Sequence, residues 1–404
     1  MPKKRYPEPR MWKIKPPIEY PMEMKYRPIL ESLVPLDPMS LIRLKRGTPE
    51  EEFPSLDQNY TVMGHILTLN MYKRQYDRAT DSGVIFSDVI QPGLEDPGQL
   101  SGPVSVGCLA GDAQCYILFC DFFDRIIEAY HGYKMTSNQE SDFNYDNLKG
   151  GDDFDREYVL GCEVRMSRCI EDFSFPVHCC RGERRQLLSL AKKALGQVEE
   201  ELPGQLHSLE ELTEDTLGEA LTMETATDVR RRTGVARDWP DARAVWISKE
   251  GNLAVWINID DHLQLVSART DSNIKKAFES ACVHLQKLEA QYRKLRRSFV
   301  WKQHLGWVVS SPAEVGTGLK ASVQLKLRHL PQHKRLQNIL ERLRLCMDFT
   351  GSSEVYKVSN AHTIGFTEVE LMQLLVDGVK LLIVMDRTLE DPEGSIDHLV
   401  PAQK

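Results

Sequence analysis

The most restrictive feature of the sequence is a run of short apolar strands that ends in one long amphipathic helix. Residues 242–248 and 253–259 are rich in β-branched and aromatic side chains, and the turn between them, Lys249 to Asn252, contains a glycine. A third alternating segment, residues 262–268, follows directly, and residues 273–297 then repeat apolar side chains at helical spacing. Consecutive strands joined by short turns pair antiparallel, so we predict an α+β fold with a mostly antiparallel sheet flanked by helices.

The composition is that of a globular chain large enough for two or three domains. Its 404 residues are 41% hydrophobic and 27% charged, and the net charge of −8 argues against a general nucleic-acid binder. The sequence has no apolar stretch long enough to span a membrane and no secretory signal. Nine cysteines without a CxxC pair indicate reduced thiols and no metal site. We therefore expect a cytoplasmic protein with no membrane or nucleic-acid partner.

Shifts in composition predict an arm, a helical domain, a linker and a larger domain. Residues 1–45 form an extended basic arm rich in proline and tyrosine, and residues 46–135 form a helical N-terminal domain. Residues 136–153 are polar and rich in Gly, Asp and Asn, which is typical of a linker. Residues 154–404 contain the predicted sheet and form the larger α/β C-terminal domain.

The start of the arm differs sharply in charge from the rest of the chain. Residues 1–28 contain eight Lys or Arg and three Glu, so they carry +5 while the remainder carries −13. Seven prolines in this segment block helix formation and favour an extended backbone. The segment is therefore either a disordered tail or an arm that lies along an acidic partner, and its four aromatic residues favour the second alternative.

Seven short strings occur in the order known from one enzyme family. They are residues 147–153 (NLKGGDD), 178–185 (HCCRGERR), 236–243 (ARDWPDAR), 255–258 with 261–263 (VWIN, DHL), 316–319 (GTGL), 376–380 (VDGVK) and 401–404 (PAQK). Together they closely resemble the phosphagen (guanidino) kinases, creatine kinase in particular, from about residue 75 to the last residue. The resemblance implies a small helical N-terminal domain, a larger domain with an antiparallel sheet, and a fold that commonly forms homodimers.

The resemblance also implies a reaction and the positions that serve it. In that family MgATP and a guanidino substrate exchange a phosphoryl group, which requires positive charge around the phosphates. At the family's five phosphate-binding arginine positions this chain has Glu163, Arg165, Gln264, Lys320 and Asp348. The set is neutral where five arginines would carry +5, and each unit-charge contact at ~4 Å is worth about 1 kcal/mol in water. Arg165, Lys320 and the nearby Arg168 are the residues that could still attract an anion.

The positions implied for catalysis differ as well. The family's catalytic glutamate corresponds to Asp260, whose side chain is one methylene shorter, and Asp261 matches an acidic position near the metal. Ser311 replaces a reactive cysteine, and a hydroxyl does not ionise near pH 7. Glu314 replaces an asparagine. Asp260 and Asp261 are thus the catalytic candidates of a degenerate site, although we favour the other interpretation, a solvated turn after a strand.

Three consecutive arginines, Arg230 to Arg232, stand where the family has an apolar run. A basic triplet is typical of a solvated face, and the alternative is a patch that binds a partner.

Two main functions follow from these observations. The neutral phosphate site favours a catalytically silent, creatine-kinase-like protein with a structural or interaction role and no cofactor. Its basic arm would bind an acidic protein, and tubulin in the axoneme of a cilium or flagellum is the specific partner that we expect. The alternative is a weak or re-tuned guanidino kinase that uses MgATP and MgADP with creatine or a related compound. A nucleotide or anion sensor without transfer is a third possibility.

Overall fold

The computed structural model describes residues 47–100, 103–199, 201–217, 220–391 and 394–401. The chain divides into two compact units after Ile126, which is earlier than the boundary predicted at residue 135. The segment predicted as a linker, residues 136–153, belongs to the second unit. The predicted basic arm, residues 1–45, lies outside the described residues.

The first unit is helical around an aromatic core. Thr61 and Thr68 cap two of its helices by accepting hydrogen bonds from backbone amides three residues further on. Phe86 packs against Phe119 and Phe122, with ring centroids 5.4 and 5.0 Å apart. The helices are α3 (Pro49–Glu52), α4 (Val62–Ile66), α5 (Leu69–Gln75), α6 (Phe86–Glu95), α7 (Cys115–Leu118) and α8 (Cys120–His131), the last of which crosses the division.

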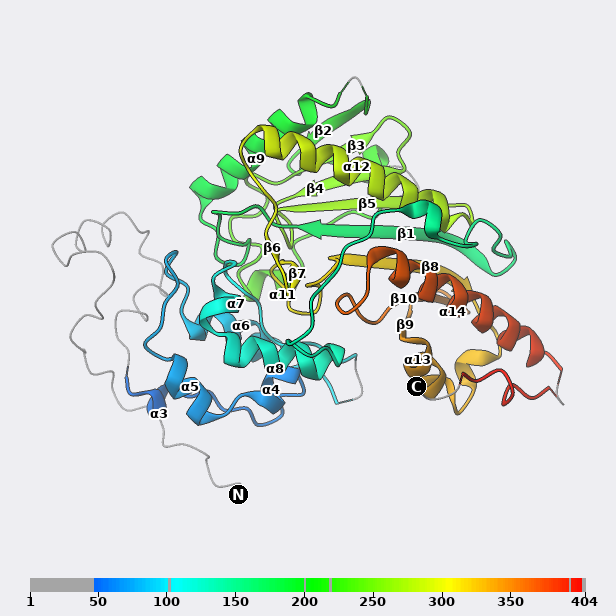
Figure 1. The fold of residues 1–404 in the computed structure, drawn as a ribbon, viewed down its shortest axis with the longest axis horizontal. Helices are drawn as coiled ribbons and strands as arrows, with labels where there is room; N and C mark the ends of the chain where they lie inside the picture. The colour runs from blue at the N-terminus through cyan, green and yellow to red at the C-terminus, as the bar shows by residue number, and fades with distance from the viewer. Residues whose placement is uncertain (1–46, 101–102, 200, 218–219, 392–393, 402–404) are drawn as a thin grey trace. The chain divides into compact units, whose positions relative to one another are not determined.

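The second unit is built on one eight-stranded sheet with the strand order β2-β3-β4-β5-β1-β8-β10-β9, antiparallel throughout (Figure 1). The predicted α+β class and antiparallel sheet are therefore confirmed. The strands are β1 (Val159–Arg168), β2 (Gly204–Ser208), β3 (Ala244–Ser248), β4 (Leu253–Ile257), β5 (Leu263–Arg269), β8 (Leu319–Lys326), β9 (Leu345–Phe349) and β10 (Val355–Asn360). A separate two-stranded ribbon pairs β6 (Trp301–Lys302) with β7 (Gly306–Trp307).

Three long helices cover one face of this sheet (Figure 1). They are α9 (Arg181–Gly196), α12 (Ile274–Lys294) and α14 (Glu368–Thr388), and α12 confirms the helix predicted from the apolar spacing of residues 273–297. The shorter elements are η2 (Tyr145–Asn147), α10 (Glu214–Leu217), α11 (Asp228–Arg232), η3 (Leu330–Gln332) and α13 (Leu336–Leu343). Across the described part of the chain, no helix is both long and apolar enough to cross a bilayer.

The alternation of side chains along β1 decides which residues face away from the long helices. Val164 and Met166 are buried in the core beneath those helices. Glu163 and Arg165 therefore project from the opposite face, because successive side chains of a strand point to opposite sides. Lys320 on β8 lies directly across from Arg165, so it projects from the same face. Glu163, Arg165 and Lys320 thus lie together on the face without the long helices.

Candidate functional site

Arg165, at the centre of this face, is bound by side chains of the chain itself. Its Nε donates to Glu163 Oε1 at 3.3 Å, and its Nη1 donates to Glu224 Oε1 and Gln264 Oε1, each at 3.1 Å. Burial by itself would lower the pKa of Arg165, but the carboxylates of Glu163 and Glu224 outweigh it and the pKa is raised. The guanidinium is therefore firmly charged and already paired with two acids.

The second predicted cation, Lys320, is also held internally. Its Nζ donates to the backbone carbonyl of Asn360 at 2.6 Å. The acidic Asp348 on β9 lies directly across from Lys357 on β10, and Lys357 Nζ is 3.6 Å from Glu163 Oε1. Lys357, a cation that the sequence analysis did not single out, thus lies next to the Glu163 carboxylate and is the cross-strand neighbour of Asp348.

Arg168 does not belong to this group, which corrects its predicted part in a residual phosphate site. Its side chain is only 1% exposed, and its Nη1 donates to the carbonyls of Ser167 at 2.7 Å and Thr317 at 2.9 Å. The guanidinium carbon lies 4.3 Å from the centre of the Trp307 ring. Burial lowers the pKa of Arg168 to about 10. Because the guanidinium is buried away from solvent, an anion in solution does not reach Arg168, and we assign it a structural role.

Asp261 is likewise a structural residue rather than an open catalytic carboxylate. It is buried, and its Oδ1 accepts from the amide of Ser310 at 2.8 Å and from Cys169 Sγ at 3.2 Å. Burial raises its pKa above the usual value. Its contacts join the turn after β4 to the end of β1 and to the loop after β7, which fixes the position of the neighbouring Asp260.

Asp260 keeps its side chain partly in solvent, at 41% exposure, but it is ion-paired with Arg230. Arg230 Nε donates to Asp260 Oδ1 at 2.8 Å, and Nη2 donates to Oδ2 of the same carboxylate. Nη2 also donates to Glu224 Oε2 at 2.7 Å. Burial would lower the pKa of Arg230, but hydrogen bonding and attraction to Asp260 outweigh it and raise the pKa. Asp260 thus lies in a partly exposed turn, as the solvated-turn interpretation expects, but its carboxylate is paired with an arginine.

The arginine triplet separates in the structure. Arg231 and Arg232 are exposed, as expected for a solvated face, whereas Arg230 turns inward and is 16% exposed. Glu224, which links Arg230 to Arg165, was missed because it stands in a loop with no periodic pattern and no motif around it. Identifying such a cluster of acids and arginines requires knowledge of the three-dimensional path of the loop.

The loop after β7 contributes Ser311 and Glu314. Ser311 Oγ accepts from the backbone amide of Ala313 at 3.3 Å, which stabilises the loop's own turn. Burial, together with the carboxylates of Asp261 and Asp260, raises the pKa of Glu314 to about 7. Near neutral pH, Glu314 is therefore only partly ionised, and it adds to the acidic character of this side of the sheet.

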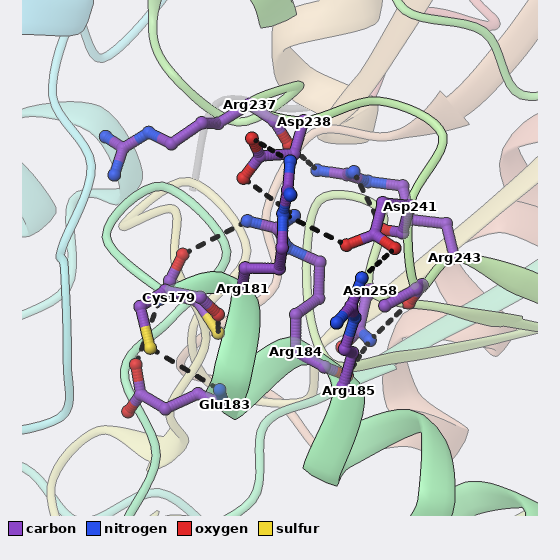
Figure 2. A network of polar contacts seen from close by, with 12 residues as sticks. Cys179, Arg181, Glu183, Arg184, Arg185, Arg237, Asp238, Asp241, Arg243 and Asn258 are labelled. Carbon is purple, nitrogen blue, oxygen red and sulfur yellow. Dashed lines mark hydrogen bonds and ion pairs between the residues drawn. The ribbon is translucent and has the colours of Figure 1, made fainter. Parts of the chain in front are cut away.

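Two of the seven strings that resemble the family, residues 178–185 and 236–243, contribute to one polar network (Figure 2). Arg181 and Arg184, in the first turn of α9, both pair with Asp238, at 2.8 and 3.4 Å. Arg185 pairs with Asp241 at 3.1 Å. Asn258, at a left-handed φ of 60°, donates from Nδ2 to the carbonyls of Arg184 and Ala242. The strings at 178–185 and 236–243 thus fix the turn that presents Asp260.

Comparison with known proteins agrees with this architecture. Residues 57–128 match the N-terminal domain of the ATP:guanido phosphotransferases, and residues 186–389 match their C-terminal catalytic domain. Human creatine kinase M-type is 42% identical over 368 residues, which covers 88% of this chain and 96% of the relative. The chain belongs to the ATP:guanido phosphotransferase family. The predicted resemblance to phosphagen kinases is therefore confirmed.

Other members of the family extend this comparison. The testis isozyme of creatine kinase from Oncorhynchus mykiss is 40% identical over 380 residues, covering 91% of this chain and 99% of that protein. The crystal structure of lombricine kinase superposes with a TM-score of 0.79 at 32% identity, over 88% of this chain and all of that one. The substrate-free duplicated taurocyamine kinase from Schistosoma mansoni, with a TM-score of 0.74 and 23% identity over 86% of this chain and 50% of that one, supports the fold alone.

Proposed function

We propose that this phosphagen kinase scaffold is catalytically silent and acts as a structural or interaction protein. The observation that carries the proposal is that the cations left at the family's phosphate site are bound by the chain itself. Arg165 is held by Glu163 and Glu224, and Lys320 by the carbonyl of Asn360. Phosphoryl transfer depends on positive charge that is free to surround the phosphates and on accurate alignment of the reactants.

The electrostatics of the site oppose a triphosphate. Glu163 and Asp348 repel phosphate oxygens, and a unit-charge contact at ~4 Å is worth about 1 kcal/mol in water and about 4 kcal/mol at an effective dielectric near 20. The carboxylate of Asp260, which would orient a guanidino substrate by analogy with the family, is occupied by Arg230. A silent site therefore needs no cofactor.

An ATP-consumption assay tests the proposal. The full chain is incubated with MgATP and creatine or other guanidino compounds in a coupled assay, with human creatine kinase M-type in parallel. We expect no acceptor-dependent formation of ADP above the protein-free background. Turnover that depends on the acceptor, and that Asp260→Asn abolishes, would replace the proposal with the alternative.

That alternative is a weak or re-tuned guanidino kinase that uses MgATP or MgADP. The 42% identity with human creatine kinase M-type over 88% of the chain favours it. The chain also keeps a carboxylate at Asp260 and positive charge at Arg165 and Lys320. The assay above separates the two functions, because only the alternative predicts turnover.

The partner of a silent protein is proposed from the charge of its arm. Residues 1–28 carry eight Lys or Arg against three Glu, so an acidic protein surface is the partner of suitable chemistry. We include tubulin in a ciliary or flagellar axoneme as the specific case, together with cytoplasmic or cytoskeletal location and possible homodimers. Microtubule co-sedimentation of the full chain and of a chain without residues 1–45 tests this, and equal binding by both excludes the arm.

A further inference from the structure

A short surface strap, residues 226–234, places one guanidinium beside the site. Its helix α11 has five residues and is capped by Thr227, whose Oγ1 accepts from the amide of Arg230 at 3.2 Å. The neighbouring side chains of Val229 and Arg231 are exposed. Arg230 alone of the triplet turns inward, so the strap presents a single charged side chain to the sheet.

The Arg230 guanidinium donates hydrogen bonds in nearly every direction in its plane, as a bound guanidinium ligand would. Nε and Nη2 form a two-pronged pair with Asp260, Nη2 also reaches Glu224, and Nη1 donates to the carbonyl of Thr225 at 2.8 Å. A planar guanidinium matches the two oxygens of a carboxylate in this way, and an ammonium does not. Glu224 and Asp260 come from different segments of the chain, and the fold brings their carboxylates together around one guanidinium.

We propose that Glu224 and Asp260 form a guanidinium-binding site that Arg230 fills from within, so that the strap excludes guanidinium compounds in solution. The inference rests on the proposed function's placement of the site at Asp260, and it names what keeps that site closed. A soluble guanidinium compound and Arg230 require the same carboxylate oxygens, so their binding is mutually exclusive.

Two features indicate that the contact between Arg230 and Asp260 can open. Asp260 remains 41% exposed, so its carboxylate is in reach of solvent as soon as Arg230 leaves. A helix of five residues is not stable by itself in water and depends on its tertiary contacts. Here these contacts are the Arg230 ion pairs and the bond from the amide of Ala236 to the carbonyl of Arg230 at 2.8 Å.

Calorimetric titration with methylguanidine, without nucleotide, tests the inference on the full chain. We expect Arg230→Ala to bind methylguanidine at least about tenfold more tightly than the wild type, because hydrogen bonds to charged groups are worth more than the 1.4 kcal/mol that corresponds to tenfold. Arg231→Ala, which removes an exposed arginine from the same helix, should behave as the wild type. Adding Asp260→Asn to Arg230→Ala should remove the gain.

Equal binding of methylguanidine by the wild type and Arg230→Ala would overturn the inference, as would a gain that survives Asp260→Asn. If Arg230→Ala does not fold, Arg230→Gln replaces it, and amide hydrogen exchange gives a second measurement. In the otherwise wild-type chain, Asp260→Asn should speed exchange in residues 226–234 by about tenfold or more, since an ion pair with charged hydrogen bonds is lost. Unchanged exchange in residues 226–234 would also overturn the inference.

These outcomes separate the inference from the proposed function. Creatine-dependent turnover by the wild type would refute the silent scaffold whatever the methylguanidine result. A silent chain whose Arg230→Ala variant fails to bind methylguanidine would refute only the filled guanidinium site. Binding of methylguanidine by a silent Arg230→Ala variant would support both.

Discussion

Replacing Glu224 by glutamine tests whether one carboxylate holds the two arginines of the site together. Its Oε1 accepts from Arg165 Nη1 at 3.1 Å, and its Oε2 accepts from Arg230 Nη2 at 2.7 Å. The side chain is 11% exposed, so water compensates little for a lost charge. We expect Glu224→Gln to lower the free energy of unfolding by about 1.5–3 kcal/mol, because glutamine keeps one acceptor and loses one hydrogen bond to a charged group.

Urea unfolding followed by tryptophan fluorescence measures this loss of stability in the second unit. Five of the six tryptophans lie in the second unit, so the signal reports mainly on its unfolding. The matched control is Glu211→Gln, which removes an exposed carboxylate from the preceding loop and should change stability by less than about 0.5 kcal/mol. If Glu224→Gln is no more destabilising than this control, the bridging role of Glu224 is refuted.

The same bridge has a defined pH dependence. Burial opposes ionisation of Glu224, but attraction to Arg165 and Arg230 outweighs it, so its pKa in the folded chain lies below the ordinary 4.5. The stabilisation is therefore fully present above the pKa of the unfolded chain and is lost as the pH falls through the folded pKa. The difference in stability between the wild type and Glu224→Gln should shrink as the pH falls below about 4.5. A difference that is constant down to acid unfolding would contradict the charge pairing.

Three further predictions concern the charges and the buried acids. Combining Glu163→Arg with Asp348→Arg should tighten MgADP binding by at least about tenfold in calorimetry, since each reversal replaces repulsion with attraction worth about 1 kcal/mol or more; unchanged affinity would argue against the electrostatic block. The raised pKa of Glu314 means that its ionised form is disfavoured in the folded chain, so the wild type should lose stability as pH rises from 4.5 to about 7. Glu314→Gln should remove this loss, which melting temperatures at pH 5 and pH 8 measure. Asp261→Ala should cost about 1–3 kcal/mol in urea unfolding by leaving the Ser310 amide unpaired, and a neutral effect would refute its structural role.

The sheet and its long helix were predictable because both depend on local periodicity. The hairpin of β3 and β4 follows from two apolar runs and a glycine-containing turn, and α12 follows from apolar residues at helical spacing. The same reasoning could have separated Arg165 from Arg168. Positions that differ by three on a strand point to opposite faces, so the two arginines could not share one phosphate site.

The closure of the site was not predictable from the sequence. Arg230 and Asp260 are separated by 30 positions, and their pairing depends on how the loop between α10 and β3 folds over the sheet. Glu224 lies in a loop without periodicity, so no pattern indicates which way its carboxylate points. The basic triplet therefore resembled a uniform solvated face, although its first arginine is held by two acids.

Calorimetric titration of the full chain with MgADP tests the central claim most directly. Human creatine kinase M-type, 42% identical over the matched region, serves as the control. With Arg165 and Lys320 bound by the chain itself, we predict no saturable heat of binding at concentrations up to about 1 mM, which corresponds to an affinity weaker than about −4.1 kcal/mol. A saturable titration with a dissociation constant in the micromolar range would contradict this account.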